Sequence, residues 1–321
     1  MMIRSAYRFM TKKLNNFYIS PSKKALIALP GGGEVCLLDI GAAGEVEPRW
    51  KPFVHFLNYV GVEPDERSRS TLLNTKNDFR SYRILPHALA AKSQSLNFKL
   101  CRKPQVSSLY EPNAEFLSRF PDVERFDIVE KIPTDCVCLD SVDVPNIDFL
   151  KLDIQGGELD VLKGAAKTLK SALGVELEVE FIDLYKEQPL FGDVCMKLSQ
   201  HEFEFIDFVN LVRWERKAHS GYGQCIFGDA LFLRPPESPI LQSFDIDKWS
   251  AYFAVLLIYR RFDLIETALE KLPDSFKSEF ESFGLVFCKA RSRDMVVRNI
   301  HKNLSRFISL FSNTYKSHLI Q

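Results

Sequence analysis

The sequence predicts an α/β protein built on a mostly parallel, doubly wound sheet. Two observations support this fold class. Strand-like and helix-like segments alternate through residues 34–85, and the chain turns after the first strand on Asp39-x-Gly41-x-x-Gly44. Alternation of this kind is typical of parallel sheets. A glycine-containing turn at the carboxyl end of a strand lets the backbone approach a ligand closely.

The hydrophobic pattern then predicts each element in order. The expected strands are 34–40, 59–62, 81–85, 95–101, 147–154, 174–181, 203–208 and 224–233. The expected helices between them are 52–58, 66–77, 157–169 and 193–200. The strand at 95–101 is interpreted as an excursion from the main sheet. The last two strands are expected to form an antiparallel pair, which a mixed sheet accommodates.

Three regions are expected along the chain. Residues 1–24 read as an N-terminal helix and linker, 25–236 as the α/β domain, and 237–321 as a C-terminal helical region. The C-terminal region contains two helical patterns, 249–259 and 262–272, with more apolar surface than an exposed helix tolerates. We therefore expect this surface to pack on the core or to form a homodimer interface.

Composition narrows the range of partners. Lys+Arg and Asp+Glu are both 42, so net charge gives no argument for a nucleic-acid partner. No apolar run reaches the ~18 residues of a transmembrane helix. The basic and apolar mixture at 3–18 fits either peripheral membrane contact or a helix packed on the domain. Seven cysteines, an odd number mostly in apolar runs, predict reduced thiols in a cytoplasmic protein without a zinc site.

An acid at the end of the next strand indicates which ligand the glycine turn binds. Glu63 follows the strand at 59–62, 24 residues after Asp39. A carboxylate there can accept hydrogen bonds from both ribose hydroxyls of an adenosyl ligand. Asp39 can meet an ammonium group of the same ligand. The turn and the two acids together therefore indicate an adenosyl-binding site.

A second polar cluster interrupts the apolar strand at 147–154. Lys151 is interpreted as either an ion pair that fixes a loop or a site residue, while Asp153 falls at the carboxyl end of the strand. Glu158 follows Gly156-Gly157 in the first turn of a helix, where a carboxylate is expected to act as a cap.

Three acids share one face of the strand at 174–181. Glu176, Glu178 and Glu180 alternate with apolar residues, which is unusual for a buried parallel strand. Their face lines a wet cleft or is covered by cations. We expect Glu178 and Glu180 to line a cleft and Glu176 to be structural.

Taken together, these residues resemble the FkbM family of S-adenosylmethionine-dependent methyltransferases. The resemblance spans about 35–235 and is carried by Leu38-Asp39-Ile40-Gly41-Ala42, Val62-Glu63-Pro64, Leu139-Asp140, Ile147 to Glu158, Leu162-Lys163-Gly164-Ala165 and Glu178-Val179-Glu180-Phe181. Ala43 stands where the second glycine of the turn is common. The resemblance implies a class I (Rossmann-like) methyltransferase fold and methylation of an oxygen, often a hydroxyl of a sugar, glycan or related natural product.

The resemblance also implies roles for individual residues. Asp39, Gly41, Ala42 and Gly44 would hold the methionine part of the cofactor, and Glu63 with Pro64 would hold the ribose. Ala88 and Leu89 would flank the adenine. Asp153 and Gln155 would lie near the sulfonium and the acceptor.

A hydroxyl is a weak nucleophile, so a general base is expected. Asp153 is the first candidate, followed by Glu178 and Glu180, with His87 and His219 as second choices. The acids with Asp229 offer oxygen ligands to a divalent metal, an alternative that is not favoured. Trp50 and Trp214 are expected to pack rather than to flank an acceptor. The acceptor pocket is expected from the segments 102–134 and 209–223.

Two rival functions use the same fold. An NAD-dependent oxidoreductase shares the turn and the acid, but the sequence has neither a full G-x-G-x-x-G nor a Tyr-x-x-x-Lys pair. A non-catalytic interaction module gives no reason for acids at several strand ends.

Overall fold

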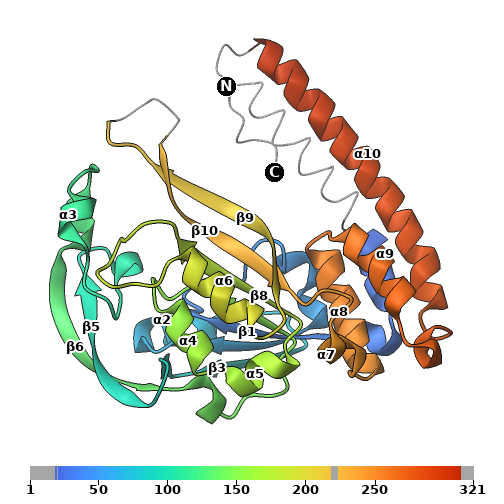
Figure 1. The fold of residues 1–321 in the computed structure, drawn as a ribbon, viewed down its shortest axis with the longest axis horizontal. Coiled ribbons are helices and arrows are strands. Elements are labelled where there is room, and N and C mark those ends of the chain that lie inside the picture. Colours follow the sequence, from blue (N-terminus) through green and yellow to red (C-terminus); the bar gives the residue numbers. More distant parts are fainter. Residues whose placement is uncertain (1–18, 20, 218–222, 312–321) are drawn as a thin grey trace. The chain divides into compact units, whose positions relative to one another are not determined.

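A computed structural model describes residues 19, 21–217 and 223–311 (Figure 1). Their contacts define two compact units. One comprises Val35–Glu47 and Leu57–Leu241, and the other comprises Pro48–Phe56 with the described parts of Met1–Glu34 and Gln242–Gln321. The basic segment at 3–18 and His219 lie outside the described residues. The three-region division expected from the sequence stays a prediction.

A seven-stranded sheet organises the larger unit, in the order β3-β2-β1-β7-β8-β10-β9. The strands are β1 (Val35–Ile40), β2 (Leu57–Val62), β3 (Ser81–Leu85), β7 (Phe149–Leu152), β8 (Gly174–Glu180), β9 (Glu204–Trp214) and β10 (Gln224–Leu233). The first five in spatial order are parallel, and β10 is antiparallel to both β8 and β9. The predicted mostly parallel sheet with an antiparallel end is confirmed.

One face of this sheet is a continuous apolar core. Alternate residues of the strands, such as Leu38, Leu150 and Leu177, are buried there with residues of three helices. These helices are α4 (Glu158–Lys163), α5 (Ala166–Ser171) and α6 (Phe191–Ser199). Because side chains alternate across a strand, the residues between them point to the opposite face. That opposite face carries Asp39, Lys151 and Glu176, which are in register on neighbouring strands.

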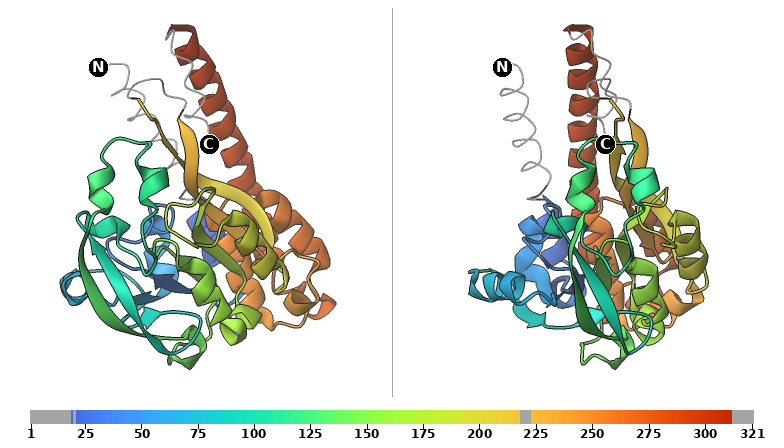
Figure 2. Two further views of the ribbon diagram at one scale, coloured as in Figure 1. Left: turned by 60° about the vertical axis from the view of Figure 1, so that its left-hand side comes forward. Right: turned by 90° about the vertical axis from the view of Figure 1, so that its left-hand side faces the viewer.

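A smaller three-stranded sheet forms the excursion, in the order β4-β6-β5. Its strands are β4 (Ala88–Leu89), β5 (Gln94–Cys101) and β6 (Ile128–Val137). Figure 2 shows β5 and β6 as a long curved ribbon beside the main sheet. Between them the chain forms η3 (Pro104–Val106), α3 (Ala114–Leu117) and η4 (Val123–Phe126), which pack in a cluster with Tyr185 and Ile226.

Three sequence-predicted elements differ from the structure. The helix expected at 52–58 is a 3₁₀ segment, η2 (Lys51–Phe56), and β2 begins at Leu57 because Leu57 pairs with Val35 of β1. The helix expected at 157–169 is two helices, and Asp140 separates them by accepting hydrogen bonds from the Lys167 and Thr168 amides.

The third difference lies at the end of the main sheet. The strand expected at 203–208 continues to Trp214, so residues 209–214 are paired with β10 rather than looped. The excursion at 102–134 likewise contains residues 128–134 of β6. Between the elements named so far lie α2 (Glu66–Asn74) and η5 (Leu139–Ser141), and α7 (Pro239–Gln242) follows the sheet.

The smaller unit is helical. Its elements are a helical turn at 21–27, η1 (Pro30–Gly32), η2, α8 (Ile246–Ile258), α9 (Phe262–Lys271), η6 (Asp274–Phe276) and α10 (Glu281–Phe311). Phe253 of α8 packs against Phe280 and Phe283, so the apolar helix at its centre is covered within this chain. The predicted helix pair is confirmed.

Two further expectations concern the whole of the described chain. Among the described residues, no helix is long and apolar enough to cross a membrane. All seven cysteines are free thiols, as the sequence predicts.

Candidate functional site

The candidate site lies where the parallel strands of the larger unit end. Backbone hydrogen bonds tie these ends together, because Gly41 and Ala42 donate to Val62, Glu63 donates to Leu85, and Asp153 donates to Ile40. The carboxyl ends of neighbouring parallel strands form the usual ligand-binding edge of such a sheet. The sequence-predicted acids on β1, β2, β7 and β8 therefore converge on one edge.

Asp39 is a buried carboxylate with one occupied oxygen. Its Oδ2 accepts a hydrogen bond from the Tyr59 hydroxyl at 2.8 Å, while Oδ1 has no hydrogen-bond partner among the described residues. Lys151 Nζ lies 3.9 Å from Oδ1. Burial raises the pKa of Asp39, and Lys151 and Tyr59 oppose that rise. A cation placed at Oδ1 would stabilise the charged form.

The two glycines of the turn serve different purposes. Gly41 has a φ of 82°, and a β-carbon there would lie 2.0 Å from the Asp153 carbonyl oxygen, so packing alone requires glycine. Gly44 has a φ of 129°, and a β-carbon there would meet nothing within 4 Å. Ala42 between them is buried, whereas Ala43 is exposed. Of the two glycines, Gly44 is the one that presents bare backbone to open space.

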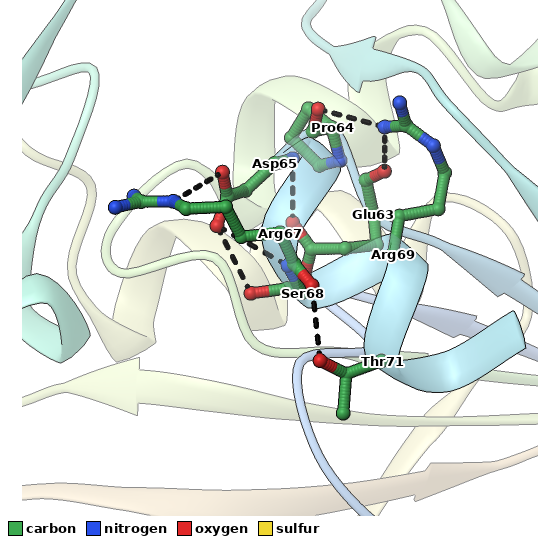
Figure 3. Close-up of polar contacts among 7 residues, drawn as sticks. All are labelled: Glu63, Pro64, Asp65, Arg67, Ser68, Arg69 and Thr71. Carbon is green, nitrogen blue, oxygen red and sulfur yellow. Dashed lines mark hydrogen bonds and ion pairs between the residues drawn. The ribbon is translucent and has the colours of Figure 1, made fainter. Parts of the chain in front are cut away.

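Glu63 is positioned by the start of α2 (Figure 3). Its Oε1 accepts a hydrogen bond from the Asp65 amide at 2.8 Å. Asp65 caps α2 through Ser68, and Arg69 donates to the carbonyl oxygens of Glu63 and Pro64. Oε2 of Glu63 accepts no hydrogen bond from any residue that the structure describes. Burial raises the pKa of Glu63, and the Asp65 amide opposes the rise.

Lys151 joins the ends of β1 and β7. Its ammonium lies 3.3 Å from Asp153 Oδ2 as well as 3.9 Å from Asp39 Oδ1. Burial alone would lower the pKa of Lys151, but the carboxylates of Asp39 and Asp153 outweigh it and raise the pKa. Lys151 therefore forms the ion pair that is one of its two interpretations from the sequence.

Gln155 connects Asp153 to β8. Its Nε2 donates to Asp153 Oδ1 at 3.2 Å and to Glu178 Oε1 at 2.9 Å. Gln155 has a φ of 61°, a left-handed conformation that costs ~1–3 kcal/mol for such a residue. The Ser108 hydroxyl donates to the Gln155 carbonyl oxygen and holds this conformation from the excursion. Burial, then the charges of Asp153 and Glu180, raise the pKa of Glu178 well above its usual range.

Glu158 and Glu180 form a second buried pair of acids. Glu158 accepts a hydrogen bond from the Ile154 amide at 2.7 Å, so it holds the loop before α4. Burial raises the pKa of Glu158 to about 7 despite this bond. Burial and the charge of Glu158 raise the pKa of Glu180 well above its usual range.

The remaining predicted residues divide between core and site edge. Leu89 belongs to the buried core, whereas Ala88 and His87 are half-buried and Pro64 is exposed.

Trp50 packs edge-on against Tyr259, and Trp214 packs against Phe120 with Arg125 over its ring, so both tryptophans pack as expected. Glu176 is buried beside Asp229, whose pKa burial raises to about 6.

Sequence reasoning missed three residues of this site. Tyr59, Ser108 and Gln188 each place a polar atom against one of the predicted acids or its loop. For Tyr59 a signal exists, because a buried tyrosine hydroxyl needs a partner and strands that follow one another in sequence are usually neighbours in a sheet. No sequence signal brings Ser108 or Gln188 to β7 and β8.

The sequence leaves a metal centre open as an alternative. Within the described ranges, no group of three or more His, Cys, Asp or Glu side chains is arranged to hold a metal ion.

Comparison with known proteins gives one family match. A model of the methyltransferase FkbM domain matches residues 39–205, more than half of the chain. No curated protein matches. A solved structure of methyltransferase FkbM from Methylobacillus flagellatus matches at 13% identity and a TM-score of 0.36, covering 61% of this chain and 44% of that one. This chain thus spans less than half of that protein's length.

The match to a second solved structure covers a larger share of that structure's chain. Magnesium protoporphyrin IX methyltransferase from Synechocystis, with S-adenosylmethionine bound, matches at 10% identity and a TM-score of 0.34. The match covers 70% of this chain and 84% of that one.

Proposed function

This chain belongs to the FkbM family of S-adenosylmethionine-dependent methyltransferases, and from that premise we propose that it methylates a hydroxyl oxygen. The acceptor is a sugar, a glycan or a related natural product. The cofactor supplies an electrophilic methyl group on a sulfonium centre. The chain itself binds and orients the two reactants and accepts the acceptor's proton.

The observation that carries this proposal is the buried Oδ1 of Asp39, which has Lys151 at 3.9 Å but accepts no hydrogen bond from any described residue. A buried carboxylate oxygen without a hydrogen bond is costly, and an ammonium group of the methionine moiety would pair with it. Gly44 supports the same pose, because its bare backbone faces open space beside the turn. Asp39, Gly41, Ala42 and Gly44 are thus proposed to hold the methionine part.

Glu63 is proposed to bind the ribose. With Oε1 fixed by the Asp65 amide, Oε2 remains available to accept from a ribose hydroxyl. Pro64 and Ala88 are exposed or half-buried and would contact the ribose and adenine. Leu89 supports this wall from the core rather than through a ligand contact.

The proton acceptor is proposed among Asp153 and Glu178, which Gln155 links, and the neighbouring Glu180. Asp153 is the first candidate, because its side chain is 38% exposed and it lies at the edge of the sheet. Lys151 Nζ lies 3.3 Å from Asp153 Oδ2 and fixes that carboxylate in place. Glu178 and Glu180 lie deeper, and burial raises the pKa of both, which makes each a stronger base than an ordinary carboxylate once it is ionised.

Two measurements test the proposal in sequence. Thermal unfolding is followed with S-adenosylhomocysteine or with NAD, and only S-adenosylhomocysteine should raise the midpoint. Glycans and natural products are then incubated with the chain and S-adenosylmethionine, and mass spectrometry should detect the gain of one methyl group. A midpoint shift with NAD alone would refute the proposal. Cofactor binding with no methylated product would instead favour a non-catalytic binding module.

A further inference from the structure

A small polar position lies behind Gly156, between β8 and the segment that follows it. Gly156 is buried, with a φ of 95°. A β-carbon there would lie 3.4 Å from Tyr185 Cδ2, 3.8 Å from Gln188 Nε2 and 3.8 Å from Glu180 Oε1. The missing side chain therefore leaves a place that one hydrogen-bond donor and one acceptor both face.

The donor and the acceptor are both unsatisfied. Gln188 Nε2 and Glu180 Oε1 are buried atoms without a hydrogen-bond partner among the described residues. The Gln188 amide is close enough to oppose the raised pKa of Glu180, yet the two atoms do not reach hydrogen-bonding geometry with each other. Buried polar atoms are normally paired, so this pair calls for an occupant.

The orientation of the Gln188 amide is fixed. The Tyr185 backbone amide donates to Gln188 Oε1 at 2.5 Å, so the amide oxygen is the occupied end and Nε2 points toward Gly156. Tyr185 is itself held by its hydroxyl, which donates to the Val106 carbonyl oxygen at 2.9 Å. The two hydrogen bonds therefore hold the Gln188 side chain in one orientation, with Nε2 facing Gly156.

We infer that Gly156, Glu180 and Gln188 form a subsite for one hydroxyl group of the acceptor. A hydroxyl matches this pair because its oxygen accepts from Gln188 Nε2 while its hydrogen is donated to Glu180 Oε1. The neighbouring loop carries Asp153 and Gln155, so a hydroxyl bound here would hold a polyhydroxylated acceptor beside the proposed proton acceptor. This subsite rests on the proposed methyltransferase function and gives its acceptor a recognised group.

The test uses the full chain with S-adenosylhomocysteine and a panel of methyl glycosides of the common hexoses as probes. Saturation-transfer NMR should detect at least one glycoside bound to the wild-type chain. Gln188→Glu keeps an oxygen for the Tyr185 amide but removes the donor, so the glycoside affinity should fall roughly tenfold or more. Gln200→Glu makes the same chemical change at an exposed position and should leave the affinity unchanged.

A reciprocal exchange keeps the test decisive if Gln188→Glu folds poorly. The double variant Glu180→Gln with Gln188→Glu restores one donor and one acceptor, so it should bind the glycoside more tightly than either single variant. S-adenosylhomocysteine affinity should be the same in all variants. Equal glycoside affinity in the wild type and Gln188→Glu, or no glycoside bound to the wild type, would show that the position holds only a buried water. Failure of the wild type to bind S-adenosylhomocysteine would instead overturn the proposed function.

Discussion

Replacing Tyr59 by phenylalanine removes one hydroxyl from the proposed cofactor site without touching the cofactor. Tyr59 lies in an aromatic stack with Phe79 and Tyr82, at ring-centroid distances of 4.6 Å and 5.4 Å. Phenylalanine preserves that stack. The substitution removes the 2.8 Å hydrogen bond that the Tyr59 hydroxyl donates to Asp39 Oδ2.

The magnitude follows from the charge and burial of that bond. A hydrogen bond to a charged group contributes about 1.5–3 kcal/mol, or roughly 10- to 150-fold in an equilibrium constant. Because the bond acts on the ligand only through Asp39, we expect the lower end, about a tenfold loss of S-adenosylhomocysteine affinity. The hydroxyl also lowers the Asp39 pKa. Without the hydroxyl, the pKa of Asp39 is higher. As the pH is lowered, Tyr59→Phe should therefore lose affinity for S-adenosylhomocysteine at a higher pH than the wild type does.

Isothermal titration calorimetry at roughly pH 5 to 9 measures both the affinity for S-adenosylhomocysteine and its dependence on pH. Tyr82→Phe is the matched control, because it removes a hydroxyl from the same stack that donates to the Leu72 carbonyl oxygen instead. As a second control, 5′-methylthioadenosine lacks the amino-acid part and should bind both variants equally. Unchanged affinity and pH profile in Tyr59→Phe, or equal losses in Tyr82→Phe, would refute the role of Asp39 as the ammonium partner.

Three further predictions concern other parts of the site. Glu63→Ala should lower S-adenosylhomocysteine affinity by roughly tenfold or more, since it removes a charged ribose acceptor, whereas Glu66→Ala on the exposed first turn of α2 should bind normally in the same titration. Asp153→Ala should reduce the methyl-transfer rate more than cofactor affinity, and a normal rate would contradict its role as the base; exposed Asp183→Ala is the control. Because burial raises the pKa of Glu178 and Glu180 well above the usual range and that of Glu158 to about 7, the folded chain retains protons that the unfolded chain releases. The contribution of these three groups to the free energy of unfolding should therefore be greatest below about pH 4.5, and it should fall as the pH rises toward 7. Urea unfolding measures it, and Glu178→Gln should flatten the slope; an unchanged slope would contradict this origin.

The sheet is predictable because its signals are local. The apolar run at 34–40 and the turn at Asp39 to Gly44 mark a strand and its carboxyl end. Strand ends of a parallel sheet meet by topology, so the convergence of Asp39, Glu63 and Asp153 follows from the sequence alone.

Two of the predicted helices were wrong because of tertiary interactions. The segment at 52–58 has a helical pattern, but its last residues pair with β1 as the start of β2. The helix at 157–169 is divided because Asp140, distant in sequence, caps its second half, and because Gly164 lies against the Ala90 carbonyl oxygen. Neither interaction leaves a signal in the local pattern.

The site residues that sequence reasoning missed are those brought in by the excursion and by the loop after β8. Ser108 and Gln188 have no fixed spacing from the acids they meet, because their positions depend on how the smaller sheet and the 181–190 segment pack. A pattern within one strand or turn carries no information about such an interaction.

The hydrogen bond from Ser108 to the Gln155 carbonyl has a consequence for engineering. If 102–134 forms part of the acceptor pocket, as the sequence predicts, exchanging this segment with that of a relative would be one way to change the acceptor. Here the flank of that segment also holds the left-handed backbone at Gln155, and Tyr110 donates to Asp160 of α4 at 2.7 Å. A graft that begins after residue 110 would leave both hydrogen bonds in the host chain, whereas one that begins at 102 would have to bring its own.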